Sequence, residues 1–270
     1  MMRARFVRTL LVLMFVGGLL LAAVTLAAPT IEKPEPWATI KGRVAWPDVK
    51  LPDRKEIEIT RDKKAILACL NGEKLFSDQF VINKDNRGVQ WAFVWLAPPK
   101  VEGGAKPISL PIHPDLKKIK VKEVVLDVPC CSFVPHAVGL RQGQTLVEKN
   151  SSTIAHNFRL DGGIDNPLNN VLVAPGKQQE VADLKPSTRP MVVSCSIHPW
   201  MRAWVRVFDH PYFAVTDENG NFEIKLAPAG NYQLMSWQEA VGYGPGGNKG
   251  MPITIKAGAD TNVGKLEVGK

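Results

Sequence analysis

The amino-acid sequence predicts an all-β protein made of two β-sandwiches. Two observations carry this prediction. Short runs of alternating apolar and polar residues recur along the chain, and the segments Asp85–Gly88, Glu218–Asn221 and Pro228–Asn231 between them are rich in Gly, Pro and Asn, which favour turns. Few stretches have the periodicity of an amphipathic helix. The expected strands are Lys41–Trp46, Glu56–Thr60, Gly88–Leu96, Ile119–Val128, His136–Leu140, Thr145–Lys149, Asn170–Ala174, Met191–Ser194, Ala203–Phe208, Asn221–Leu226 and Asn231–Trp237.

Composition and charge narrow the class of protein further. The 270 residues are 45% hydrophobic and 22% charged, which excludes a disordered or collagen-like chain and allows one large or two modest domains. The net charge is +8, but Arg3, Arg5 and Arg8 all lie within the first ten residues. No basic run with interleaved aromatic residues follows, so we expect no nucleic-acid partner.

Residues 1–28 have the pattern of a secretory signal peptide. A short cationic stretch precedes about twenty apolar or small residues, and Ala27 and Ala28 stand before Pro29. An uncleaved N-terminal membrane anchor is the alternative, because twenty apolar residues also suffice to span a bilayer. Both interpretations place the rest of the chain outside the cytoplasm, in the periplasm or secreted.

The four cysteines are Cys69, Cys130, Cys131 and Cys195. An oxidising compartment permits disulfides, and Cys195 has a separate role proposed below. Adjacent cysteines rarely bridge each other, so we expect Cys69 to pair with Cys131, or alternatively with Cys130. Three small buried thiols are the other interpretation.

One constellation of residues carries chemistry. Cys195, His198 and Met201 form the pattern Cys-x2-His-x2-Met between two expected strands, and His156 stands 39 residues before the cysteine. One thiolate, two imidazoles and a thioether are the ligand set of a mononuclear blue-copper site. Three unrelated structural residues are the plain alternative, and zinc is another, although a thioether is a poor zinc ligand.

At these residues the sequence resembles the cupredoxins. The loop Cys-x2-His-Pro-x-Met is most similar to that of the amicyanins, which have the shortest ligand loop of the family, and the resemblance extends over residues 122–208. It implies a Greek-key β-sandwich that binds one type 1 copper ion. The copper ligands implied by the resemblance are His156, Cys195, His198 and Met201.

The resemblance also implies roles around these ligands. The Asn157 side chain would tie the His156 loop to the loop around Cys195, and Ser196 would present its backbone N–H or its hydroxyl to the same tie. The last histidine of such loops usually faces solvent, so an exposed edge of His198 is the expected exit for electrons.

The flanking segments resemble the carboxypeptidase regulatory-like domains, which are small transthyretin- or Ig-like β-sandwiches. Residues 209–270 contain the hairpin and the Pro-x-Gly-x-Tyr turn of that family, whereas its opening strands match residues 40–46 and 88–96. We therefore expect one sandwich in two parts, 38–108 and 209–270, with the copper domain at 122–208 inserted. Secreted proteins of the methylamine-utilisation-like type have a similar order.

These features predict outer-sphere electron transfer between redox partner proteins rather than an enzyme. Ser194 and Ser196 flank the cysteine where multicopper oxidases have histidines, and the loop has no second cysteine for a binuclear centre. Alternatives are a cell-surface, carbohydrate- or protein-binding sandwich with a structural or vestigial copper site, and periplasmic copper delivery. His113 in the connector is expected to be solvated, and His136 and His210 are expected to be structural, although His136 could form a second metal site with the neighbouring cysteines.

Overall fold

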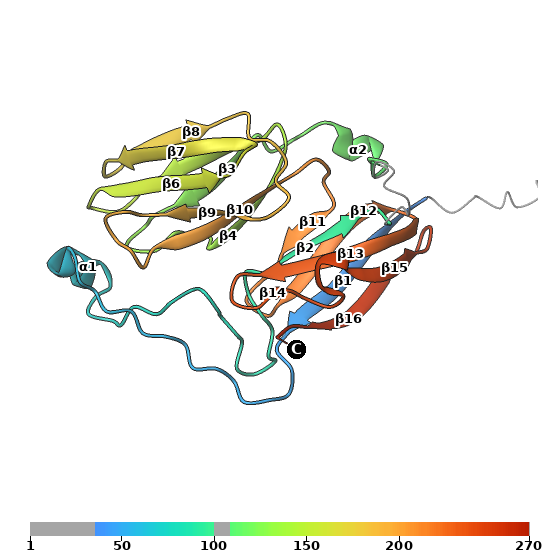
Figure 1. The fold of residues 1–270 in the computed structure, drawn as a ribbon, viewed down its shortest axis with the longest axis horizontal. Coiled ribbons are helices and arrows are strands. Elements are labelled where there is room, and N and C mark those ends of the chain that lie inside the picture. Colours follow the sequence, from blue (N-terminus) through green and yellow to red (C-terminus); the bar gives the residue numbers. More distant parts are fainter. Residues whose placement is uncertain (1–35, 100–108, 270) are drawn as a thin grey trace, which may run out of the picture. The chain divides into compact units, whose positions relative to one another are not determined.

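The computed structural model describes residues 36–99 and 109–269, and these form an almost entirely β structure (Figure 1). The expected signal peptide or anchor at 1–28 and the middle of the connector, 100–108, lie outside the described residues. Within the described ranges, no helix combines the length and the apolar character that a membrane span requires.

A central sandwich is formed by residues 123–208. One sheet has the order β4-β10-β9-β6-β7 and the other the order β3-β5-β8. Alternating apolar residues of both sheets, such as Leu140, Leu146, Phe158 and Val193, share one buried core. The strands are β3 (Glu123–Asp127), β4 (Ala137–Arg141), β5 (Thr145–Lys149), β6 (His156–Gly162), β7 (Asn166–Val173), β8 (Gln178–Val181), β9 (Met191–Ser194) and β10 (Arg202–Phe208).

A terminal sandwich combines strands from both ends of the chain. Its sheets have the orders β12-β1-β16 and β11-β2-β13-β14, with β15 also paired to β13. Ile40 on β1 faces Ile224 on one neighbouring strand and Thr261 on the other. The strands are β1 (Trp37–Ala45), β2 (Phe93–Ala97), β11 (Phe213–Val215), β12 (Asn221–Pro228), β13 (Gly230–Gln238), β14 (Gly242–Tyr243), β15 (Met251–Ile255) and β16 (Thr261–Glu267).

An aromatic cluster joins the two sandwiches. Phe93 and Trp95 on β2 share this cluster with Ala137 on β4 and Phe208 on β10. Gly139 on β4 permits the close approach, because a Cβ at that position would lie 2.6 Å from the ring of Phe213 on β11. The sandwiches are therefore packed directly against each other through large side chains.

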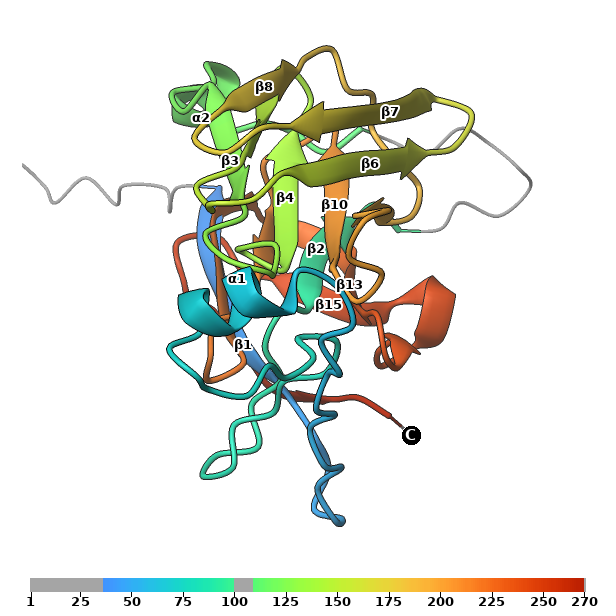
Figure 2. The same ribbon diagram turned by 90° about the vertical axis from the view of Figure 1, so that its left-hand side faces the viewer.

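The connection between β1 and β2 differs from the expectation. Residues 56–60 form no strand, and only an isolated bridge joins Glu56 to Phe76. The alternating Ile57 and Ile59 instead pack on a small cluster around Ile66 of the helix α1 (Lys63–Cys69). Figures 1 and 2 show α1 beside the end of the central sandwich that carries the β9–β10 loop. The described residues also contain the short helical turns α2 (Pro114–Lys117) and η2 (Gly247–Lys249).

Candidate metal centre

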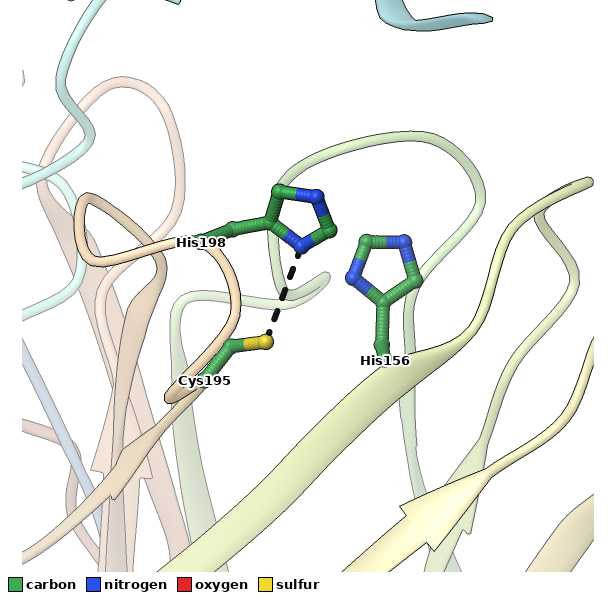
Figure 3. A group of neighbouring side chains, drawn as sticks. All are labelled: His156, Cys195 and His198. Atoms are coloured by element: carbon green, nitrogen blue, oxygen red, sulfur yellow. Dashed lines mark hydrogen bonds between the residues drawn. The ribbon is translucent and has the colours of Figure 1, made fainter. Parts of the chain in front are cut away.

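Three of the four expected ligands meet at one end of the central sandwich (Figure 3). His156 is the first residue of β6, Cys195 directly follows β9, and His198 lies in the loop before β10. Their ligand atoms lie within 4.8 Å of one another, and all three side chains are buried. Two segments distant in the sequence therefore converge on a single buried cluster of one sulfur and two imidazoles.

Sheet register explains this convergence. The strands β6 and β9 are antiparallel neighbours, with Arg159 opposite Ser194. Continuing that register beyond the end of β9 brings the His156–Asn157 end of β6 beside Cys195 and Ser196. The ladder of the sheet thus positions His156 and Cys195, whereas His198 depends on the loop that follows β9.

Backbone hydrogen bonds close the β9–β10 loop tightly. The Cys195 N–H donates to the Met201 carbonyl at 3.3 Å, and the Met201 N–H donates to the His198 carbonyl at 2.9 Å. Met201, the fourth expected ligand, has a side chain that is only 2% exposed and belongs to the same apolar core cluster as Cys195. The loop therefore holds its Cys, His and Met in a compact turn at the end of the core.

Asn157 joins the two ligand segments. Its backbone N–H donates to Cys195 Sγ at 3.4 Å, and its side-chain Oδ1 accepts the backbone N–H of Ser196 at 3.1 Å. The side-chain amide in turn donates to Asn170 Oδ1 at 2.7 Å. The donor that Ser196 uses is its backbone N–H, and the Asn157 side chain is itself held in place from β7.

The turn before His156 is ordered by buried polar side chains that sequence reasoning missed. Asn150 donates to the carbonyls of Ile154 and Val173, both at 2.8 Å, and its Oδ1 accepts the Ser152 hydroxyl at 2.7 Å. Hydrogen bonds from side chains to the nearby backbone are typical of Asn and Ser in turns. The Asn-Ser-Ser run at 150–152 therefore could have indicated this ordered turn. They fix the point at which β6 begins, and with it the position of His156.

Burial keeps the His156 imidazole neutral. Loss of hydration, followed by the proximity of His198, lowers the pKa of His156 to about 4, although the Cys130 backbone and Asp62 oppose the shift. Neither ring nitrogen has a hydrogen-bond partner of normal geometry among the described residues. A neutral, buried imidazole with an unused lone pair is a ready metal ligand.

His198 does not have the exposed edge that the sequence suggested. Its side chain is 0% exposed, and its Nε2 lies 3.0 Å from Oδ2 of Asp62, just before α1. The ring of Trp200 lies beside it, with the two centroids 5.2 Å apart. The expectation was wrong because α1 and the residues before it cover this end of the sandwich, which the loop pattern alone does not reveal.

The disulfide joins Cys69 at the end of α1 to Cys130, with the two Cα atoms 6.0 Å apart. The expected pairing with Cys131 is therefore wrong, whereas the alternative is the observed one. Cys131 has a free thiol that is 1% exposed and packs in the cluster with Ile66. Burial, with a smaller contribution from Asp78, raises the pKa of Cys131 to about 11.

The other histidines stay outside the cluster. His136 pairs with Glu239 in a buried contact, so the expected possibility of a second site with the cysteines is not realised among the described residues. The His113 Nδ1 accepts the Asp115 N–H at 3.1 Å, and the His210 Nδ1 accepts the Tyr212 N–H at 3.1 Å. All three have structural partners.

The residues present fit a soft first-row metal ion. Cys195 Sγ and His198 Nδ1 are 3.7 Å apart. One metal ion could bind both atoms, with bonds of roughly 2.3 Å to sulfur and 2.0 Å to nitrogen and a wide angle between the two bonds. The neutral His156 faces the same space. A thiolate with two imidazoles suits copper and also zinc, and a nearby thioether favours copper.

Comparisons with known proteins add little to this geometry. No family model matches the sequence, and no curated protein matches it. Amicyanin from Paracoccus versutus is a similar solved structure, with 18% identity over 33% of this chain and 85% of that chain and a TM-score of 0.29. A copper-containing nitrite reductase from Thermus scotoductus has 21% identity over 40% of this chain and 25% of that chain, with a TM-score of 0.28. At these scores the similarity assigns no function.

Proposed function

We propose that the protein binds one type 1 copper ion through His156, Cys195, His198 and Met201 and carries single electrons between partner proteins. The observation that carries this proposal is the convergence of one thiol and two imidazoles, from two distant segments, in a buried space. A carrier of this kind fits the resemblance of the ligand loop to the cupredoxins.

The residues around the ligands support such a role. A copper ion held there would supply one-electron chemistry by alternating between Cu(II) and Cu(I). The Asn157 N–H donates to Cys195 Sγ and draws charge from the sulfur, whereas the tie from Asn157 to Ser196 holds the two segments at a fixed separation. Ligands fixed by a sheet and a closed loop move little, so little reorganisation opposes electron transfer.

The environment of the loop favours transfer over substrate chemistry. Cys195 is 3% exposed and His156 and His198 are 0% exposed, so the chain leaves the ligands little access to water or a bound substrate. Pro199 and Ser196 are the exposed residues of the loop, and we propose that redox partners dock transiently near them. The Cys69–Cys130 disulfide supports a location outside the cytoplasm, in the periplasm or secreted.

The test is a visible and electron paramagnetic resonance spectrum of the copper-loaded protein, compared with two cysteine variants. We expect an intense thiolate-to-copper absorption band that a mild reductant removes reversibly. Cys195→Ser should lose the band and keep the fold, whereas Cys131→Ser, which alters the other free buried thiol, should keep both.

Other outcomes would contradict the proposal in distinct ways. A wild-type protein that is colourless at full copper loading would indicate a structural or vestigial site. Preferential binding of Cu(I) with rapid transfer to a chelator would indicate copper delivery. An unchanged absorption band in Cys195→Ser would show that the ligand assignment is wrong.

A further inference from the structure

We propose that residues 54–78 form a cap that completes the copper centre, and that Asp62 within it is a positioning residue that fixes His198 as a ligand. This inference rests on the proposed function, since it concerns the same centre. It assigns a role to a segment that lies far from the ligand motif in the sequence and outside residues 122–208, over which the chain resembles the cupredoxins.

The two ends of the cap are joined by hydrogen bonds and an ion pair. The Ile57 N–H donates to the Leu75 carbonyl at 2.8 Å, and the Ser77 N–H donates to the Lys55 carbonyl, also at 2.8 Å. An ion pair of 2.6 Å between Arg54 and Asp78 joins the two ends. These contacts bring both ends of the segment together, so that α1 and the residue before it project from a closed base.

The cap is held on the central sandwich at two places. The Cys69–Cys130 disulfide is a covalent tether from the end of α1. A small apolar cluster is shared by both sides, because Ile66 of the cap packs in the same group as Cys131, Ile154 and Trp200 of the central sandwich. This second attachment needs no metal, so the chain itself places the cap over the ligand loop.

Asp62 reaches the ligand histidine from this docked cap. Its Oδ2 lies 3.0 Å from Nε2 of His198, while Nδ1 of the same ring faces Cys195 Sγ at 3.7 Å. A carboxylate beside Nε2 favours the imidazole tautomer that is protonated on Nε2. In this tautomer Nδ1 has a free lone pair, which points to the metal position. The two ring nitrogens thus have separate tasks, one toward the cap and one toward the sulfur.

The negative charge of Asp62 has a further consequence for the centre. A carboxylate that accepts the ligand's N–H raises the electron-donating strength of the imidazole, which favours the more highly charged Cu(II). It also stands where the ring would otherwise face water, since the Asp62 side chain is 48% exposed and the His198 side chain 0%. Electrons would leave past Asp62 and Trp200 rather than from an open imidazole edge.

The experiment compares Asp62→Asn and Asp62→Ala with Glu58→Gln in the full chain. Glu58 lies on the same cap and is exposed, so Glu58→Gln removes an equal charge at a site that does not contact the ligands. We expect Asp62→Asn to raise the reduction potential, and Asp62→Ala to weaken copper binding by about tenfold or more and to speed copper transfer to a chelator. Glu58→Gln should match the wild type in all three measurements.

A second readout separates this inference from the proposed function. In the metal-free protein, nitrogen-15 NMR of the imidazoles should find the His198 proton fixed on Nε2 in the wild type and shared between both nitrogens in Asp62→Ala. A wild type that forms no coloured copper complex would overturn the proposed function, while this NMR result still decides the Asp62–His198 contact. Asp62 variants that match Glu58→Gln in potential, copper transfer and tautomer would overturn the positioning role.

Discussion

The backbone N–H of Asn157 donates to Cys195 Sγ at 3.4 Å, and this hydrogen bond connects the start of β6 to the cysteine sulfur. The same residue accepts the Ser196 N–H with its side chain. One residue therefore controls both the charge on the sulfur and the separation of the two ligand segments.

Asn157→Ala should weaken the centre without removing a ligand. The variant keeps the backbone bond to the sulfur but removes the acceptor of the Ser196 N–H, and loss of this partly buried hydrogen bond costs about 1 kcal/mol. We expect lower stability in urea unfolding and a displaced thiolate-to-copper band. Asn170→Ala, which removes only the outer support of Asn157, should shift the band less. Identical spectra for Asn157→Ala and the wild type would contradict the role given to this side chain.

Releasing the cap tether should loosen the centre. The double variant Cys69→Ser/Cys130→Ser removes a crosslink between positions 61 residues apart, for which a loss of about 2–4 kcal/mol is typical. We expect lower stability in urea and faster copper transfer to a chelator, because the cap over His198 opens more often. Cys131→Ser is the comparison, since it alters the apolar cluster under the cap but removes no crosslink. Equal transfer rates in both variants would mean that the tether does not restrain the centre.

Glu148 should make the stability of the fold depend on pH. Its side chain is 0% exposed on β5, and burial raises the pKa of its carboxyl from 4.5 to about 7, despite hydrogen bonds from Gln179 and Asn169. The folded state then binds this proton more tightly than the unfolded state, so the contribution of Glu148 to stability falls as pH rises from about 4.5 to about 7 and is constant above.

Glu148→Gln should remove this dependence, because an amide can accept the same two hydrogen bonds but never ionises. Relative to the wild type, the free energy of unfolding of the variant should increase by an amount on the order of 3 kcal/mol between pH 4 and pH 8. Urea unfolding at each pH measures this difference. Glu180→Gln on β8 changes an exposed carboxylate and is the control. A difference between variant and wild type that is the same at both pH values would disprove the assignment.

Much of the architecture could be predicted because it depends on local pattern. The alternation of Thr145–Lys149 and Met191–Ser194 gave the observed strands β5 and β9. The strand β6 was missed because its first two residues, His156 and Asn157, are polar although buried, and they conceal the alternation of Phe158, Arg159 and Leu160. The short polar strand Gln178–Val181 likewise has no apolar face from which it could be recognised.

The convergence of His156, Cys195 and His198 could be predicted, but the surroundings of these side chains could not. Cys195, His198 and Met201 share one loop, so their spacing alone indicates a site. Asp62 lies 136 residues from His198 within a polar run, and only the folded chain brings the two together. The residue boundaries proposed for the domains stay predictions, as do the cleavage of the leader and the identity of the redox partners.

Ile40 on β1 pairs in parallel with Thr261 on β16. The sheet that contains both strands can therefore be completed only near the end of chain synthesis. Every strand of the central sandwich lies between these two residues in the sequence, so the whole of this sandwich has been synthesised before β16. The edge of β1 that β16 covers must wait for nearly the whole polypeptide, and contacts of such long range form slowly. The central sandwich can thus fold while the terminal sandwich is still incomplete, and truncation near the C-terminus would leave β1 with an open edge.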